Sequence, residues 1–366
     1  MAGTFIFRAD GNAEIGAGHL MRCLTIASAL RERLCTDEGI CFVCADEGSG
    51  HFVRQRGFRV LLTGTDYRLM ETELSFWEGF AEGMEAPRCI LIDSYYVTKD
   101  YIMALKQYGR TALLEDKGER ALPVELLINY HIYADRELYD KLYRGQAVRL
   151  CLGAGYVPLR EEFRKASYQI RDCVKDVLIT TGGGDKDNIG GAVLKELISS
   201  ASGITWHLVV GSFHPHLEEL RQMEAQLSNV VIEQDVQHMA ELMTKCDICV
   251  SAGGTTLYEL AALGVPFICF SYAENQETLT EYIGAHDIAG FAGAWHRDEG
   301  ETLGNIRGFF LELLASLEKR SRYHKNERAL IDGQGAGRIA KALAEELAKE
   351  TAGKQINGKS DKADGK

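Results

Sequence analysis

The sequence predicts an α/β protein made of two doubly wound domains, each with a parallel sheet. Short apolar runs alternate with segments of helical periodicity through most of the chain. Both halves open with the same unit, in which a strand is followed by a glycine loop and then by a helix. The length of 366 residues is sufficient for two domains of ordinary size.

Composition and charge are typical of a globular protein in water, with 46% hydrophobic and 26% charged residues. The net charge of −12 argues against nucleic acid as a main partner, because phosphate backbones require a basic face. No apolar run approaches the 18 residues of a membrane span, and no signal-peptide pattern opens the chain. We therefore expect a cytoplasmic monomer without a membrane span that binds a small molecule.

The ten cysteines are scattered, many of them within apolar runs, which is typical of reduced and buried thiols. Two C-x-x-C pairs, Cys41/Cys44 and Cys246/Cys249, raise the alternative of a zinc site. Cys41 and Cys44 fall in one predicted strand and Cys249 in another, and at this odd spacing the two members of each pair would point to opposite faces. We therefore expect no metal and no cofactor.

The elements fall into two series separated by an irregular, charged stretch at 153–174. Strands are predicted at 5–8, 40–45, 59–62, 89–93, 111–114, 126–129 and 149–152, then at 176–180, 205–210, 230–233, 248–251 and 267–270. Helices are predicted at 20–34, 50–56, 69–82, 99–108 and 257–263, and the segment 300–348 is predicted to be helical. This organisation gives domains at 1–165 and 166–350 and a disordered tail at 351–366.

The stretch Gly16-Ala17-Gly18-His19 lies between the first strand and the first long helix. Gly16 and Gly18 let the backbone approach a ligand closely, because they carry no Cβ. The positive end of the helix dipole disfavours the imidazolium form of His19, and a neutral imidazole can accept a proton. The stretch predicts a general base beside a bound anion; the alternative is a simple turn followed by a surface histidine.

Two further glycine loops follow strands of the second half, at Gly182-Gly183-Gly184 and at Gly253-Gly254. The second is the stronger candidate for a diphosphate site, because the backbone N–H groups at the start of the next helix can hold phosphates without a lysine. Thr255 or Thr256 can cap that helix. Neither loop has the Lys-Ser/Thr pair of a P-loop.

Other polar side chains stand where such folds bind ligands, near the carboxyl ends of strands. Glu259 lies one turn further along the helix and can accept both hydroxyls of a ribose, although a solvated helix charge is the alternative. Asn275 and Gln276 can bond sugar hydroxyls, with a helix cap by Asn275 as the alternative. The remaining candidates are the 235–239 loop with Met239, which can meet a base edge, and Asp10, Asp93 and Tyr95 on the sugar side.

Several motifs resemble the PseG family, the UDP-2,4-diacetamido-2,4,6-trideoxy-β-L-altropyranose hydrolases of pseudaminic acid synthesis. They are Arg8-Ala9-Asp10, the segments 15–19 and 21–23, the segment 155–163, and Asn275-Gln276. The related SpsG-type spore-coat proteins share the pattern. The segment 251–276 is also similar to the nucleotide site of the MurG-type GT-B glycosyltransferases.

This resemblance implies a GT-B fold, with two Rossmann-like domains facing across a cleft and UDP in the C-terminal one. The implied reaction is an inverting, metal-independent hydrolysis of a UDP-sugar to UDP and the free sugar in nonulosonic acid biosynthesis. His19 matches the catalytic base, and Glu259 matches the ribose-binding glutamate. The resemblance further implies a diphosphate loop at Gly253, Gly254 and Thr255, and substrate contacts from Arg8, Asp10, Tyr156, Arg160, Asn275 and Gln276.

The chain departs from the family pattern on the sugar side. Pro158 stands between Tyr156 and Arg160, and the family's usual acidic and amide patterns are replaced at Glu115-Asp116 and at 129–131. Two alternatives to a hydrolase remain. One is a GT-B glycosyltransferase that moves the sugar to an acceptor in surface polysaccharide synthesis, and the other is a sugar-nucleotide-binding protein without activity.

Overall fold

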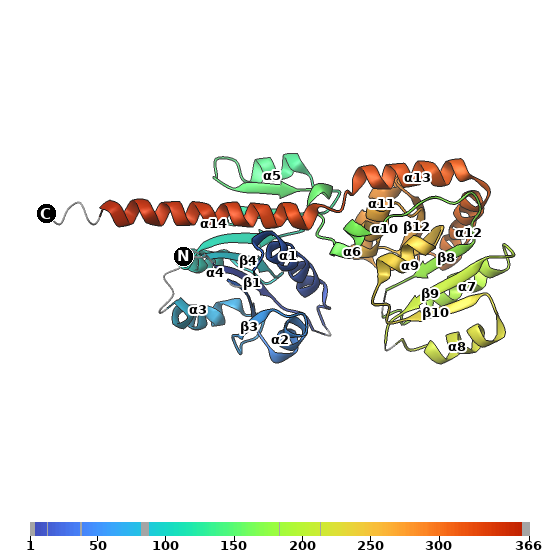
Figure 1. The fold of residues 1–366 in the computed structure, drawn as a ribbon, viewed down its shortest axis with the longest axis horizontal. Helices are drawn as coiled ribbons and strands as arrows, with labels where there is room; N and C mark the ends of the chain where they lie inside the picture. Colours follow the sequence, from blue (N-terminus) through green and yellow to red (C-terminus); the bar gives the residue numbers. More distant parts are fainter. Residues whose placement is uncertain are drawn as a thin grey trace. The chain divides into compact units, whose positions relative to one another are not determined.

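The computed structural model describes residues 4–12, 14–36, 39–81, 88–182, 184–212 and 214–360. The chain divides into two compact units (Figure 1). Unit 1 comprises Met1–Pro158 and Gln334–Lys366, and unit 2 comprises Leu159–Gly333. Each unit is built on one parallel sheet, so the predicted α/β class is confirmed.

Unit 1 contains a seven-stranded parallel sheet in the order β3-β2-β1-β4-β5-β6-β7. Its strands are β1 (Thr4–Ala9), β2 (Ile40–Cys44), β3 (Arg59–Leu62), β4 (Arg88–Asp93), β5 (Arg110–Leu114), β6 (Leu126–Asn129) and β7 (Arg149–Leu152). Its helices are α1 (Gly18–Leu34), α2 (Glu47–Arg54), α3 (Leu74–Ala81), α4 (Lys99–Leu105), α5 (Arg136–Leu142) and α14 (Gly335–Ser360), with 3₁₀ turns η1 (Met70–Glu73) and η2 (Ala154–Tyr156).

Unit 2 contains a six-stranded sheet in the order β10-β9-β8-β11-β12-β13, again parallel. Its strands are β8 (Asp176–Thr180), β9 (Thr205–Val210), β10 (Val230–Gln234), β11 (Ile248–Ala252), β12 (Phe267–Ser271) and β13 (Gly290–Ala294). Its helices are α6 (Glu161–Lys165), α7 (Ile189–Ile198), α8 (Leu217–Gln226), α9 (Met239–Lys245), α10 (Thr255–Leu263), α11 (Glu274–Ala285), α12 (Glu299–Ala315) and α13 (Leu317–Leu330).

The two sheets reverse their winding direction at equivalent places. In unit 1 the chain moves outward from β1 through β2 to β3 and then returns to place β4 on the other side of β1. In unit 2 the same reversal occurs between β8 and β11. Doubly wound sheets bind ligands at this switch point, outside the carboxyl ends of the strands. Each unit therefore has one place where the fold favours a binding site.

The central strands are continuous apolar runs because parallel sheets are covered on both faces. Every residue of β2, β4, β11 and β12 is buried. Cys41, Cys44 and Cys249 lie in these strands, whereas Cys246 lies at the end of α9, before β11; all four are buried free thiols. Within the described part of the chain, no helix is both long enough and apolar enough to cross a membrane.

The last helix corrects the predicted domain boundaries. α14 lies alongside α1 and packs on β4, β5 and β6, with Ile339, Ala340 and Leu343 fully buried (Figure 1). The segment from 334 onward therefore belongs to unit 1 rather than to a domain at 166–350, and the boundary after 165 moves to Pro158. Sequence periodicity identifies an apolar helix face but not the sheet that it covers. Helix α14 also extends to Ser360, where a disordered tail is predicted, and 361–366 lie outside the described residues.

The predicted strands are all found, and the deviations have local causes. β13 was not predicted, because its sequence Gly-Phe-Ala-Gly-Ala lacks a strand-forming pattern. α2 begins at Glu47 rather than at Gly50, because the Asp46 carboxylate accepts a hydrogen bond from the Ser49 N–H and caps the helix. The predicted helix 69–82 is divided into η1 and α3, and α4 ends at Leu105 rather than at 108.

Candidate functional site

His19 lies in the first turn of α1, directly beside the end of β4. Gly16 has a φ of +69°, a conformation that favours glycine, and brings the chain from β1 into the helix. The N-cap residue Ala17 provides no side-chain cap. His19 Nδ1 lies 2.6 Å from Oδ1 of Asp93, which is the last residue of β4. The switch point of unit 1 therefore brings together two residues 74 positions apart.

This pairing decides which ring nitrogen of His19 can act as a base. Since a carboxylate only accepts hydrogen bonds, Nδ1 carries the proton towards Asp93 and the lone pair lies on Nε2. The His19 residue is 7% exposed, and the Tyr95 ring meets its imidazole edge-on at 4.8 Å between centroids. A small pocket adjoins the ring and is lined by Asp10, Ile15, His19, Tyr67, Asp93, Ser94, Tyr95 and Tyr96.

Arg22 belongs to the same cluster, although the sequence analysis did not predict it as a site residue. Its Nε lies 2.5 Å from Oδ2 of Asp93, and its Nη2 lies 2.5 Å from Oδ1. Burial alone raises the pKa of Asp93, but the charge and hydrogen bonds of Arg22, together with His19, lower it to about 2. The spacing of three residues after His19 was the available signal, because residues i and i+3 share a helix face.

Asp10 lines the same pocket, and its carboxylate forms an ion pair with Arg8. Its Oδ1 accepts a hydrogen bond of 2.7 Å from the backbone N–H of Ala45, and its Oδ2 pairs with Arg8. Arg8 has no exposed surface and also pairs with the buried Glu73. Protein encloses the Arg8 guanidinium, so the structure does not support the predicted contact between Arg8 and the substrate. Arg8 instead holds the carboxylate of Asp10 in place.

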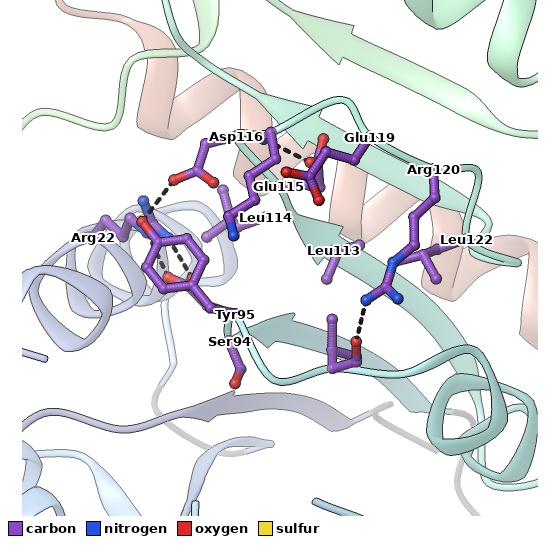
Figure 2. A pocket seen from close by; sticks show the side chains of 13 residues that line it. Arg22, Ser94, Tyr95, Leu113, Leu114, Glu115, Asp116, Glu119, Arg120 and Leu122 are labelled. Atoms are coloured by element: carbon purple, nitrogen blue, oxygen red, sulfur yellow. Dashed lines mark hydrogen bonds and ion pairs between the residues drawn. The ribbon is translucent and has the colours of Figure 1, made fainter. Parts of the chain in front are cut away.

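Tyr95 also lines a second pocket, which has a volume of about 70 Å³. Figure 2 shows Arg22, Tyr95 and Asp116 at one end and Arg120 at the other. Tyr95 donates a hydrogen bond of 2.8 Å to Asp116, and burial followed by the Asp116 charge raises the pKa of Tyr95. The Glu115-Asp116 stretch, where the sequence analysis notes a departure from the PseG pattern, lines this pocket together with Asp93.

In unit 2, Gly253 and Gly254 form the corner between β11 and α10. Gly254 is the N-cap of α10 and no side chain caps the helix, which corrects the expected capping by Thr255 or Thr256. A Cβ on Gly254 would meet nothing within 4 Å, whereas a Cβ on Gly253 would lie 2.8 Å from Cβ of Gln276. Gly253 thus permits close packing, and Gly254 leaves space in front of the helix N-terminus, where anions bind.

Glu259 lies one turn into α10, partly buried, and contacts Arg160 of the same unit. Oε1 of Glu259 is 3.4 Å from Nη2 of Arg160, whose Nη1 pairs with Glu162 at 2.7 Å. Burial raises the pKa of Glu259 to about 7, and Arg160 opposes this increase. The structure therefore joins two predicted site residues that sequence reasoning had assigned to different parts of the substrate.

The remaining predicted residues of unit 2 surround the same sheet edge. Gly182 has a φ of +92°, and a Cβ on Gly182 or Gly184 would meet nothing within 4 Å; Gly183 lies outside the described residues. Met239 begins α9, next to Ala240, whose N–H donates to Glu162. The N-cap of α11 is Ala273, so the alternative of a cap by Asn275 is wrong. Asn275 is exposed, while Oε1 of Gln276 accepts from the Tyr272 N–H at 3.1 Å.

Tyr156 is the predicted residue that the structure separates from the others in unit 1. It ends η2, which follows the edge strand β7, whereas His19 and Asp93 lie at β1 and β4 in the middle of the sheet. It lines neither of the two pockets beside Tyr95. Among the described residues, no group of three or more His, Cys, Asp or Glu side chains is arranged to hold a metal ion.

No family model matches the chain. It is 25% identical over 344 residues to the spore coat polysaccharide biosynthesis protein SpsG of Bacillus subtilis, covering 92% of this chain and 96% of that protein. It is 23% identical over 280 residues to the UDP-2,4-diacetamido-2,4,6-trideoxy-beta-L-altropyranose hydrolase of Campylobacter jejuni, covering 76% and 95%. An uncharacterized protein of Methanocaldococcus jannaschii is 24% identical over 285 residues, and the match spans 75% of this chain but 57% of that protein.

The fold of this chain is similar to that of several solved structures. MurG of Acinetobacter baumannii superposes with a TM-score of 0.66 at 10% identity, covering 94% of this chain and 100% of that one. A putative UDP-N-acetylglucosamine 2-epimerase of Listeria monocytogenes gives a TM-score of 0.64 at 14% identity, covering 95% and 98%. The expected similarity to PseG, SpsG and MurG is confirmed, and so is the GT-B fold class.

Proposed function

We propose that this protein hydrolyses a UDP-sugar to UDP and the free sugar, with His19 as the general base. The observation that carries the proposal is the His19–Asp93 pair, which leaves the lone pair on Nε2 beside a pocket at the switch point of unit 1. The relatives support it, since one of them is named as a hydrolase of a UDP-linked diacetamido sugar and another as a polysaccharide biosynthesis protein. We propose a sugar of that diacetamido class as the substrate.

In the proposed reaction, Nε2 of His19 takes a proton from water while the water oxygen attacks the anomeric carbon. The bond between that carbon and the β-phosphate oxygen breaks, its electron pair leaves with UDP, and the configuration inverts. Asp93 stabilises the imidazolium that forms, as an oriented carboxylate does for a catalytic histidine. Asp10 and Tyr95 line the same pocket and are proposed to orient the water or the sugar.

Unit 2 is proposed to hold the nucleotide. The uncapped N-terminus of α10, opened by Gly254, offers N–H groups and a positive dipole end to the diphosphate and offsets the charge of the departing UDP. Glu259 is proposed to accept the two ribose hydroxyls, which requires Arg160 to share or release its carboxylate. Asn275 and Gln276 follow the next strand and are proposed to contact the sugar and phosphate.

A glycosyltransferase is the second candidate, because the solved neighbour MurG has the same fold over nearly the whole chain. Transfer and hydrolysis use the same nucleotide half of the protein and differ in what attacks the sugar. The second pocket beside Tyr95 gives this candidate a place where an acceptor hydroxyl could replace water.

The decisive experiment incubates the full chain with a panel of UDP-sugars and measures UDP release and the sugar formed. A hydrolase releases stoichiometric UDP and free sugar without any acceptor. If release is slow and accelerates strongly when a polysaccharide or peptide acceptor is added, the glycosyltransferase candidate replaces the hydrolase. UDP binding without release from any member of the panel would leave a binding protein.

A further inference from the structure

We propose that Arg22 is a positioning residue that holds the Asp93 carboxylate in a fixed orientation and, through its positive charge, opposes protonation of the His19 ring. The inference deepens the proposed function, because it concerns the base of that reaction. Arg22 does not line the small pocket beside the His19 ring; it contacts Asp93 from the other side and lines the second pocket (Figure 2). It therefore acts through Asp93 and His19.

Three nitrogens of the Arg22 guanidinium form hydrogen bonds with neighbouring side chains. Nε and Nη2 of Arg22 engage both oxygens of Asp93 in a bidentate arrangement, and Nη1 donates to the Tyr130 hydroxyl at 2.9 Å. The Arg22 side chain is 14% exposed and the Asp93 side chain is fully buried. Bidentate pairs fix the plane of a carboxylate as well as its charge. Oδ1 of Asp93 is thus directed at Nδ1 of His19.

The charge arrangement distinguishes this pair from an isolated aspartate–histidine pair. A carboxylate alone next to an imidazole favours the imidazolium, which has no lone pair for a base. Here the guanidinium balances the carboxylate, and its Nη2 also lies 3.0 Å from Nδ1 of His19. Asp93 can therefore fix the tautomer while the positive charge of Arg22 opposes protonation of the ring.

Other charged or titratable groups around His19 do not replace this effect. Asp10 reaches the same pocket and pairs with Arg8, but Arg8 is shared with Glu73, so this cluster has one cation for two carboxylates and cannot replace the positive charge of Arg22. Tyr67 and Tyr96 line the pocket from the loops after β3 and β4, and the Tyr95 hydroxyl is directed at Asp116, which also faces His131 at 3.9 Å. On α1, Cys23 contacts Asp93 at 3.6 Å, and burial raises its thiol pKa well above the usual value, which keeps it neutral.

The test replaces Arg22 in the full chain and follows the ring nitrogens of His19 by ¹⁵N NMR as a function of pH, with assignment from a His19→Asn variant. Arg22→Met removes the guanidinium charge and leaves Asp93 facing His19 alone. We expect the pH at which His19 titrates to rise by about one unit or more, and the acid limb of the kcat/KM profile to move with it.

Three further variants distinguish the effect of the Arg22 charge from the effect of its hydrogen-bond geometry. Arg22→Gln is the second neutral variant if Arg22→Met does not fold, and we expect the same upward shift. Arg22→Lys keeps the charge but not the fork, so the titration stays near that of the wild type while kcat falls. Tyr130→Phe removes one anchor of Arg22 and keeps the charge, so His19 titrates as in the wild type.

The inference is overturned if His19 titrates at the same pH in the folded neutral variants as in the wild type. It is also overturned if the neutral variants lower the rate equally at every pH. The NMR titration does not depend on turnover. An upward shift in a protein that hydrolyses no UDP-sugar would therefore reject the proposed function and retain the role of Arg22.

Discussion

The switch points of the two units have the same topology but present different chemistry. At β1 and β4 of unit 1, the fold brings together ionisable side chains, namely His19, Asp93 and Arg22. At β8 and β11 of unit 2, it presents glycine loops and an uncapped helix N-terminus, with Glu259 one turn away. Side chains can exchange protons, whereas backbone N–H groups can only hold a charge in place.

The difference extends to the buried carboxylates. Asp93 of unit 1 has its pKa lowered to about 2, because Arg22 and His19 outweigh its burial. Glu259 of unit 2 has its pKa raised to about 7, because burial outweighs the more distant Arg160. Between pH 6 and 8, Asp93 stays ionised and Glu259 changes charge. The two switch points therefore differ in the charge state that burial and the neighbouring cations give to their carboxylates.

The largest effect is expected from His19→Asn in unit 1. Loss of the base should lower kcat by about 10²- to 10⁴-fold, while the Kd for UDP stays within error of the wild type. Coupled measurement of UDP release and calorimetric titration with UDP check the two halves of this expectation. The control is His51→Asn, since His51 is an exposed histidine of α2 in the same unit. Normal turnover by His19→Asn would remove the catalytic assignment of unit 1.

The next effect is expected from Glu259→Gln in unit 2. A neutral amide cannot replace a carboxylate that accepts two ribose hydroxyls, so UDP should bind about 10- to 100-fold more weakly. Since the wild-type pKa is raised to about 7, affinity should increase as pH rises from 6 to 8 and level off above.

Calorimetry at several pH values checks both statements about Glu259, and the amide variant should lose the pH dependence. Glu241→Gln is the matched control, because Glu241 is an exposed glutamate of α9 paired with Lys245. A wild-type affinity that is flat across this range would contradict a role for the Glu259 charge.

Smaller effects are expected from the two glycines between β11 and α10. Substitution of Gly254 should change UDP affinity, and substitution of Gly253 should change stability. Gly254→Ala places a methyl in open space on an extended backbone, so the melting temperature should hold while UDP affinity falls about tenfold. Gly253→Ala places its Cβ 2.8 Å from Gln276 and 2.9 Å from Thr280, so it should lower the unfolding free energy by about 1–3 kcal/mol. Thermal unfolding and UDP titration of both variants measure the contrast. Equal binding by Gly254→Ala and the wild type would exclude the helix N-terminus as the phosphate site.

The smallest effect concerns a buried carboxylate without catalytic assignment. Glu327 of α13 has no exposed surface, and burial raises the pKa of its carboxyl well above the usual value. Because the folded state favours the protonated form, stability should fall as pH rises above the unfolded value. Glu327→Gln should remove this dependence and raise the unfolding free energy at pH 8 by about 1 kcal/mol. Denaturant unfolding at pH 5 and pH 8 tests it, with the exposed Glu318→Gln as the control.

Much of the fold could be predicted because local patterns follow from local physics. Continuous apolar runs bounded by turns located β1 to β12, and the glycine loops located the ends of β1, β8 and β11. β13 was missed because its glycines and alanines are accommodated by packing rather than by strand propensity. The predicted boundary of the second domain was wrong because the sequence of α14 shows an apolar face but not the sheet on which that face packs.

The candidate site, like the fold, could be predicted only in part from the sequence. The sequence by itself determined that His19 starts a helix after a glycine loop, that Asp93 ends an apolar strand, and that Gly254 precedes α10, because these are relations between neighbouring residues. The tertiary structure alone decided that Asp93 meets His19 and Arg22, that Arg8 is enclosed behind Asp10, and that Arg160 reaches Glu259. These pairings depend on the order in which strands enter a sheet, and strand order is set by the packing of the whole unit.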